Sequence, residues 1–142
     1  MAVIVQRPSA AFIAASWAAL CIGALGFIIA LWNSERPLNE KGFYFVVLMY
    51  GLFAAVSLQK SVRDQLEGLP VTSLYFGLCW ASMAICCLSL LIGLWNAPLA
   101  GAVKGMYGMS FLLALFGAVA VQKNVRDIAI AERVEQRPPS ES

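Results

Sequence analysis

Gln59-Lys60-Ser61-Val62-Arg63-Asp64 recurs 63 residues later as Gln122-Lys123-Asn124-Val125-Arg126-Asp127. Aligning residues 9–64 on residues 72–127 at this offset gives 20 identities in 56 positions without a gap. Chance similarity between two apolar stretches would not bring charged and turn residues into register, so the chain contains an internal duplication. The other segments repeated at this offset are Leu31-Trp32-Asn33 with Leu94-Trp95-Asn96, Lys41-Gly42-Phe43-Tyr44 with Lys104-Gly105-Met106-Tyr107, and Leu52-Phe53 with Leu115-Phe116.

The composition excludes a soluble protein. Of the 142 residues, 61% are hydrophobic and 13% are charged, whereas soluble domains have roughly 45–50% apolar and about 25% charged residues. A chain of this size cannot hide so much apolar surface in one core. The sequence has no histidine, which removes the commonest general base and a common metal ligand. A formal net charge of +2 is too small to indicate a nucleic-acid partner.

Four stretches without charged residues predict four membrane-spanning helices, because a helix needs about 20 apolar residues to cross a bilayer. We place them at Ala10–Trp32, Gly42–Leu58, Thr72–Trp95 and Gly105–Val121. Each repeat is then a hairpin that returns the chain to the side it left, so both repeats have the same orientation. The predicted fold is an all-α membrane protein, a four-helix bundle of two tandem hairpins related by a pseudo-two-fold axis along the membrane normal.

The distribution of Lys and Arg predicts that both termini face the cytoplasm. Seven of these residues lie on the side of the termini and the central loop, and three lie on the opposite side. The more basic side of short loops is the cytoplasmic one. The expected order is a cytoplasmic N-terminus at 1–8, the first repeat at 9–64, a cytoplasmic loop at 65–71, the second repeat at 72–127, and a cytoplasmic tail at 128–142 that extends the last helix by a turn or two and then frays.

The doubled motifs resemble those of the YiaA/YiaB family of bacterial inner membrane proteins. The resemblance rests on the two copies of Leu-Trp-Asn, Lys-Gly-x-Tyr, Leu-Phe-(Ala/Gly)-Ala-Val and Gln-Lys-x-Val-Arg-Asp, and on Leu38-Asn39-Glu40-Lys41-Gly42 in the first loop. It covers about residues 9–127. The second copy departs from the first, because Ala102-Val103 replaces Asn39-Glu40. The resemblance implies the bacterial inner membrane and a duplicated two-helix fold, and it implies no activity.

Small residues at every fourth position of the first predicted helix indicate close helix packing, because they let two backbones approach. Two interpretations stay open: packing within the chain against Gly51 and Ala55 of the second helix, and a subunit interface. The candidate packing or oligomer face is Ala11, Ala15, Ala19, Gly23 and Gly26.

Aromatic residues lie where an interfacial belt is expected, at the ends of the predicted spans away from the termini. Asparagines follow both tryptophans and can form hydrogen bonds at the helix C-termini. A ligand pocket built from the paired Trp-Asn corners is the less favoured interpretation. The candidate periplasmic interface anchors are Trp32, Asn33, Tyr44, Trp95, Asn96 and Tyr107.

The repeated Gln-Lys-x-Val-Arg-Asp segment contains the chain's only concentrated polarity. On a continuing helix its Lys and Asp are four residues apart and can pair. We expect the segment to contact the anionic headgroups of phospholipids, and a docking site for a cytoplasmic partner is the alternative. The candidate residues are Lys60, Arg63, Asp64, Lys123, Arg126 and Asp127.

The predicted spans contain no ionisable side chain other than cysteine and tyrosine, which disfavours a proton-coupled transporter. We interpret the four cysteines as packing residues, and we expect no catalytic, cofactor or metal site. The preferred hypothesis is a non-enzymatic inner membrane protein that acts as a homo-oligomer or as an accessory subunit of a membrane assembly. The alternative is a channel or facilitator with a pore between protomers, whose polar lining would come from backbone carbonyls and from Ser57, Ser82, Ser89 and Ser110.

Overall fold

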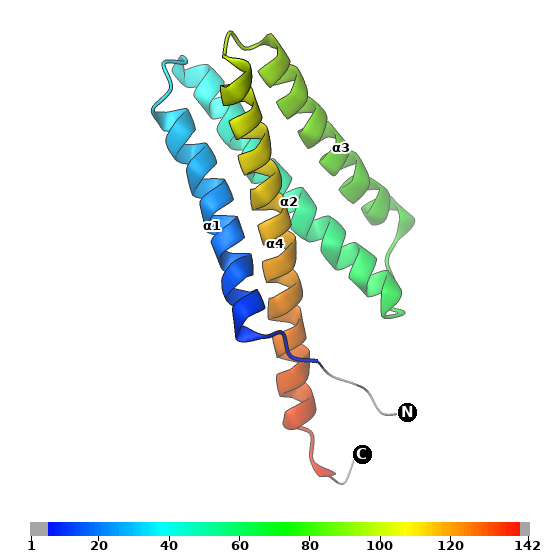
Figure 1. Ribbon diagram of the computed structural model, residues 1–142. Coiled ribbons are helices and arrows are strands. Elements are labelled where there is room, and N and C mark those ends of the chain that lie inside the picture. The colour runs from blue at the N-terminus through cyan, green and yellow to red at the C-terminus, as the bar shows by residue number, and fades with distance from the viewer. Residues whose placement is uncertain (1–5, 140–142) are drawn as a thin grey trace.

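Four long helices make up the computed structural model, which describes residues 6–139 (Figure 1). They are α1 (Ala10–Trp32), α2 (Leu38–Leu66), α3 (Ser73–Asn96) and α4 (Gly101–Glu135). All four are long and apolar enough to cross a membrane. The predicted all-helical fold with two tandem two-helix units is therefore present. Residues 1–5 and 140–142, which belong to the predicted N-terminus and fraying tail, lie outside the described residues.

The observed helix ends agree with the uncharged stretches for α1 and α3 but not for α2 and α4. α1 has the predicted bounds, and each end of α3 differs from the prediction by one residue. Ser9 and Thr72, which are equivalent positions of the two repeats, cap these helices by accepting hydrogen bonds from the backbone N–H groups of Phe12 and Tyr75 at 3.2 and 3.3 Å. α2 and α4 extend beyond the predicted spans at both ends, because the absence of charge marks the part that can lie in lipid and not the end of a helix.

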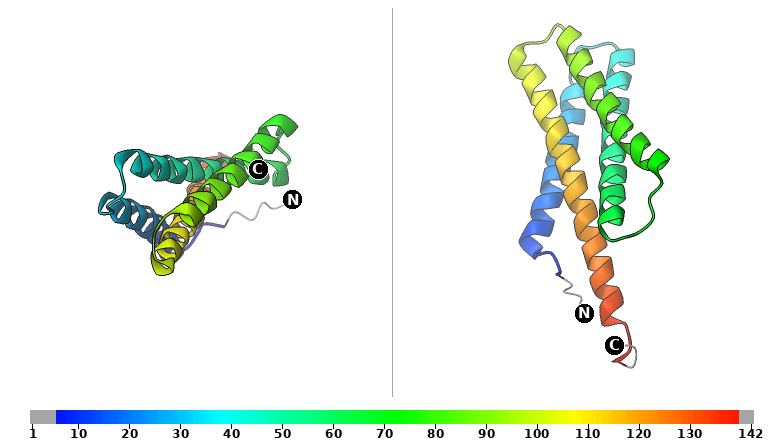
Figure 2. Two further views of the ribbon diagram at one scale, coloured as in Figure 1. Left: turned by 90° about the horizontal axis from the view of Figure 1, so that it is seen from above. Right: turned by 90° about the vertical axis from the view of Figure 1, so that its right-hand side faces the viewer.

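The first residues of α1 and α3 lie at the same end of the bundle as the last residues of α2 and α4 (Figures 1 and 2). We call this the motif end, because both Gln-Lys-x-Val-Arg-Asp segments are found there, and we call the opposite end the Trp-Asn end. The two helices of one repeat form few contacts with each other. Instead α1 packs along α4, α3 packs along α2, and α2 contacts α4 between them. Each repeat therefore covers its apolar faces with helices of the other repeat.

The contact between α1 and α4 is a close approach of two backbones. A Cβ atom on Gly23 would lie 2.4 Å from the backbone nitrogen of Ala114, and one on Gly117 would lie 2.3 Å from that of Leu20. The expectation that α1 packs against Gly51 and Ala55 of α2 is therefore wrong. The intrachain partner of its small residues is α4, because the repeats exchange their helices.

The equivalent contact between α2 and α3 has the same plan with different residues. Cys86 occupies the position of Gly23, and Gly51 occupies the position of Ala114, so the small and larger residues are exchanged. The Cys86 thiol donates a hydrogen bond to the Val47 carbonyl at 3.0 Å. Ala54 stands where α4 has Gly117. α2 and α3 diverge from α1 and α4 towards the motif end (Figure 1).

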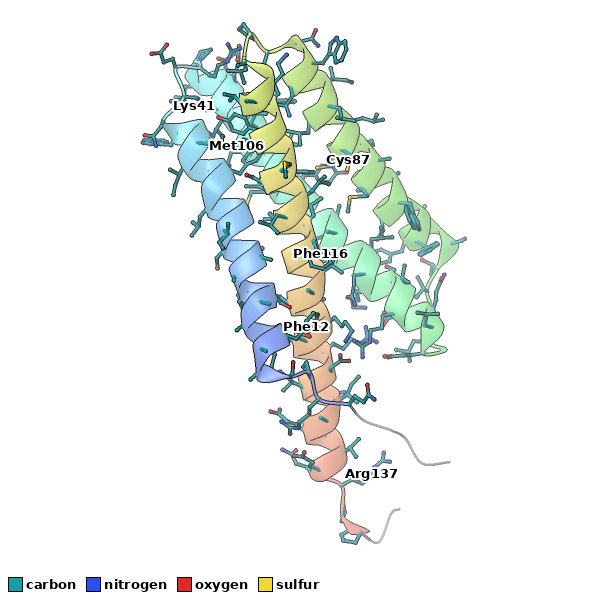
Figure 3. All side chains as sticks on the ribbon, in the orientation of Figure 1. Phe12, Lys41, Cys87, Met106, Phe116 and Arg137 are labelled. Atoms are coloured by element: carbon teal, nitrogen blue, oxygen red, sulfur yellow. The ribbon has the colours of Figure 1, made fainter. Side chains whose placement is uncertain are left out.

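The core lies along the α2–α4 contact in the half of the bundle near the Trp-Asn end. Phe27, Leu48 and Phe111 are fully buried there. Large apolar side chains cover the outside of all four helices, as expected for a surface that faces lipid (Figure 3). Apolar character alone therefore does not determine which face of a helix points into the bundle. Close packing and a few polar contacts determine it instead.

Candidate functional site

The two repeated motifs bind each other at the motif end. Arg63 of the first copy pairs with Asp127 of the second, and Arg126 of the second pairs with Asp64 of the first, the latter at 2.6 Å. The reciprocity follows from the pseudo-two-fold axis, because each arginine reaches the carboxylate of the equivalent segment. These ion pairs join α2 to α4 near the motif end, at the level where α2 and α4 have begun to diverge.

Lysines complete the two ion pairs along their own helices. The Lys60 ammonium lies 2.8 Å from Asp64, and the Lys123 ammonium lies 2.8 Å from Asp127. Both i, i+4 pairs expected from the motif are thus present. The lysine side chains remain 55% and 53% exposed, whereas those of the four residues in the reciprocal pairs are 11–19% exposed. The arginine side chains are therefore occupied by ion pairs within the chain, whereas the lysine side chains remain exposed.

Glu67 breaks the symmetry of this cluster. It accepts hydrogen bonds from Arg63 at 2.9 Å and from Arg126 at 2.7 Å, whereas the equivalent position of the second repeat is Ile130. The hydrogen bond from Arg63 holds the pKa of Glu67 below its ordinary value, and the bond from Arg126 adds to this effect. The cluster therefore contains four cations and three carboxylates.

The variable position of the motif forms buried contacts that sequence reasoning missed. Asn124 donates a hydrogen bond to the Ser16 hydroxyl at 3.1 Å, which joins α4 to α1. At the equivalent positions, the Ser61 hydroxyl lies 3.6 Å from the Cys79 thiol, which joins α2 to α3. The signal was a small polar residue at the same position of both copies. Asn124, Ser16, Ser61 and Cys79 are all at most 5% exposed.

The aromatic residues of the Trp-Asn end separate into two kinds. Trp32 and Trp95 are 74% and 84% exposed, as an interfacial anchor requires. Tyr44 and Tyr107 are buried, and their rings stack on each other with centroids 6.4 Å apart. Tyr44 and Tyr107 come soon after the loops in the chain, and they lie on the helix faces that meet at the pseudo-two-fold axis. The structure therefore places both tyrosines inside the bundle.

The Lys-Gly-x-Tyr motif has a role that the sequence did not suggest. Lys41 donates a hydrogen bond to the Trp32 carbonyl at 3.0 Å, and Lys104 donates one to the Trp95 carbonyl at 3.3 Å. A cation at the C-terminus of a helix satisfies a free carbonyl and interacts favourably with the helix dipole. Asn96 donates to the Ile92 carbonyl at 2.9 Å, and the backbone N–H of Asn33 donates to the Ile29 carbonyl at 3.0 Å.

The candidate packing face of α1 divides between two surfaces. Gly23 is buried against α4 and Ala19 is half-buried, whereas Ala11, Ala15 and Gly26 are exposed. Gly23 and Ala19 therefore serve packing within the chain, and Ala11 and Ala15 form the outward half of the small-residue pattern.

The other serines and cysteines named from the sequence are buried or half-buried, apart from the exposed Cys21. Ser57 is buried, and Ser82, Ser89 and Ser110 are half-buried. All four cysteines are free. Among residues 6–139, no group of three His, Cys, Asp or Glu side chains is placed to hold a metal ion.

Comparison with known proteins identifies both repeats. The model of the yiaA/B two helix domain matches the chain twice, at residues 12–64 and 75–127. The chain is 51% identical over 134 residues to "Inner membrane protein YiaA" of Escherichia coli (strain K12), which covers 94% of this chain and 88% of that protein. It is 33% identical over 63 residues to "Uncharacterized membrane protein YubF" of Bacillus subtilis (strain 168), which covers 44% of this chain and 72% of that protein. No solved structure gives a significant match.

Proposed function

Because the chain belongs to the yiaA/B two-helix domain family, we propose that it is a non-enzymatic protein of the bacterial inner membrane that acts by helix packing, as a homo-oligomer or as an accessory subunit of a larger membrane assembly. The Escherichia coli relative is an inner membrane protein by name, which supports the location. Four helices of membrane-spanning length and composition support insertion.

The observation that carries the proposal is the outward half of the small-residue pattern on α1. Ala11 and Ala15 are exposed on a helix whose other side already packs against α4. In lipid, helices associate through close van der Waals packing, and small residues permit that approach. The equivalent surface of α3 has larger residues, with Leu74 in place of Ala11 and Leu78 in place of Ala15.

These equivalent positions supply a matched cross-linking experiment. The native cysteines are replaced by serine or alanine, and single cysteines are introduced by Ala15→Cys or Leu78→Cys. Cross-linking is then measured in native membranes. We expect cross-linked products only with Ala15→Cys: a dimer for a homo-oligomer, or a product with another protein for an accessory subunit. Equal yields at the two positions, or none at either, would contradict the role of α1.

The proposal includes an orientation with both termini in the cytoplasm, supported by the excess of Lys and Arg at the motif end. In this orientation the exposed ammonium groups of Lys60 and Lys123 lie at the level of phospholipid headgroups, where they contact anionic groups. Fusion of a reporter that is fluorescent only in the cytoplasm tests the C-terminus. Fluorescence supports the orientation, and activity of a reporter that requires the periplasm overturns it.

A further inference from the structure

Sulfur-containing side chains are concentrated on one face of α3. Cys79, Met83 and Cys87 follow one another at every fourth position, and Cys86 lies beside them, so all four belong to the same side of the helix. The two copies of the duplicated helix differ in this respect, because α1 has no sulfur atom at the equivalent positions, which are Ser16, Leu20, Gly23 and Ala24.

Two of the three thiols on this face are explained by helix packing. The Cys86 thiol donates a hydrogen bond to the Val47 carbonyl at 3.0 Å and is fully buried. The Cys79 thiol lies 3.6 Å from the Ser61 hydroxyl and is also buried. Both thiols therefore have a polar partner on α2.

Cys87 and Met83 form a pair of a different kind. The Cys87 thiol donates to the Met83 thioether at 3.9 Å. Both side chains are half-buried, and Cys87 lies on the side of α3 towards the other helices (Figure 3). A metal ion about 2.3 Å from each sulfur fits this separation, because its two bonds would form an angle of roughly 115°. The flexible methionine side chain lets this angle open further.

A groove of about 530 Å³ connects this pair with the surroundings of the bundle. It lies between α2 and α4, and Met83 extends from α3 to line it. The charged residues that line the groove belong to the motif end, and they are Arg63, Glu67, Lys123 and Asp127. An ion can therefore pass from the motif end to the Met83 thioether without crossing the buried core.

The donor atoms and their surroundings select the type of metal. A thiol and a thioether are soft ligands, which favour copper(I). A structural zinc site has four ligands, and within residues 6–139 no three His, Cys, Asp or Glu side chains are placed to hold a metal ion. Residues 68–103 contain no charged side chain, so a divalent ion on one thiolate would leave a positive charge uncompensated in apolar surroundings. A monovalent ion and one thiolate together are neutral.

We propose that Met83 and Cys87 form a binding site for a soft monovalent metal ion, copper(I), which reaches them through the groove. Binding replaces the thiol proton: the S–H bond of Cys87 breaks, the thiolate binds copper(I), and the proton passes to water. No electron is transferred, and the metal remains copper(I). This role goes beyond the packing expected of the cysteines, and it does not depend on a subunit interface on α1.

The duplication supplies the variants for the test, because each substitution introduces the residue that the other repeat has at the equivalent position. Met83→Leu and Cys87→Ala follow positions 20 and 24, and the control Cys21→Ala follows position 84. The proteins are purified in detergent without oxygen, and copper(I) binding is measured by competition with bicinchoninate, whose copper(I) complex is coloured. X-ray absorption spectra of the loaded protein identify the atoms bound to copper.

We expect the unaltered protein and Cys21→Ala to bind one copper(I) per chain, with sulfur as the only neighbouring element and with no displacement by excess Zn²⁺. Cys87→Ala abolishes binding, because it removes the anionic ligand. Met83→Leu conserves the side-chain volume and lowers the affinity at least about 100-fold, the upper end of the effects of outer-shell partners.

Four results would overturn the proposal. The first is an unaltered protein that binds no copper(I), and the second is a Met83→Leu protein with undiminished affinity. The third is equal loss of binding in Cys21→Ala, which would assign the metal to thiols in general. The fourth is displacement by Zn²⁺ or a spectrum with nitrogen or oxygen neighbours, which would contradict the soft, neutral site.

Discussion

The close approach of α1 and α4 at Gly23 predicts a large effect of a single methyl group. In Gly23→Ala, the new Cβ would lie 2.4 Å from the backbone nitrogen of Ala114 and 2.8 Å from the Ser110 carbonyl oxygen. Ordinary contact begins at 3.4 Å, so the helices must separate by about 1 Å, a strain typical of overpacked cores. No side-chain rotation relieves the overlap, because the opposing atoms belong to the backbone.

The expected magnitude follows from two opposing contributions. Overpacking costs about 1–3 kcal/mol, and we take about 2 kcal/mol because several backbone atoms overlap at once. Alanine gains about 0.8–1.0 kcal/mol over glycine in helix propensity. Gly23→Ala therefore lowers the free energy of unfolding by about 1 kcal/mol. Gly26→Ala is the control on the same helix, because its Cβ would meet nothing closer than the Ser110 hydroxyl at 3.9 Å. It keeps only the propensity gain.

The assay is reversible unfolding in mixed micelles, with sodium dodecyl sulfate as the denaturant and tryptophan fluorescence as the signal. The two variants should differ by about 2 kcal/mol in the direction of a less stable Gly23→Ala. The difference should not change with protein concentration, because the contact lies within one chain. A Gly23→Ala protein as stable as Gly26→Ala would refute the close packing, and a strong concentration dependence would assign Gly23 to a subunit interface.

Further predictions concern the motif end and the exchanged helices. A double-mutant cycle between Arg63 and Asp127 should give a coupling energy of about 1–3 kcal/mol, because the pair is mostly buried, and the cycle between Lys123 and Asp127 should give at most about 0.5 kcal/mol. Asn124→Leu should lower the free energy of unfolding by about 0.6–1.7 kcal/mol, the range of hydrogen bonds between membrane helices. Glu67 has a lowered pKa, so its contribution is complete above the ordinary glutamate pKa of about 4.3 and is lost as the pH falls through the folded value. Glu67→Gln should reduce the loss of stability between neutral pH and pH 3. The two repeats expressed as separate chains, divided in the loop after α2, should assemble with each other and co-purify, and recovery of either half as a stable monomer would contradict the exchanged packing.

The sequence was sufficient for the helices and their duplication because both depend on local patterns. The uncharged stretches located α1 within its observed bounds, and the spacing of Lys60 and Asp64 correctly placed the motif on a continuing helix. The partners of the helices could not be predicted in this way. Two hairpins packed as separate units and two hairpins with exchanged helices have the same local pattern and the same offset, and only the three-dimensional fit of Gly23 to α4 distinguishes them.

The inward direction of the tyrosines and arginines also depended on that fit. An aromatic residue near the end of a span is typical of both an interfacial belt and a packed core, and a basic residue just beyond the span is typical of both headgroup contact and an ion pair. The position of each residue relative to the pseudo-two-fold axis determines which of the two roles it has. It brings Tyr44 against Tyr107 and each arginine within reach of the opposite carboxylate.

Duplication explains why the molecule can differ on its two sides without losing its fold. A strictly symmetric pair of repeats would have the same helix approach at both crossings, and a feature on one side would have a copy on the other. Here Gly117 allows α1 to approach α4 closely, whereas the equivalent position of α2 is Ala54. The reciprocal pairs of Arg63 and Arg126 hold α2 and α4 together at the motif end, so the divergence on one side does not separate the helices. The interactions that both repeats share lie along the axis, whereas the outer faces differ, because α1 has Ala11 and Ala15 where α3 has Leu74 and Leu78.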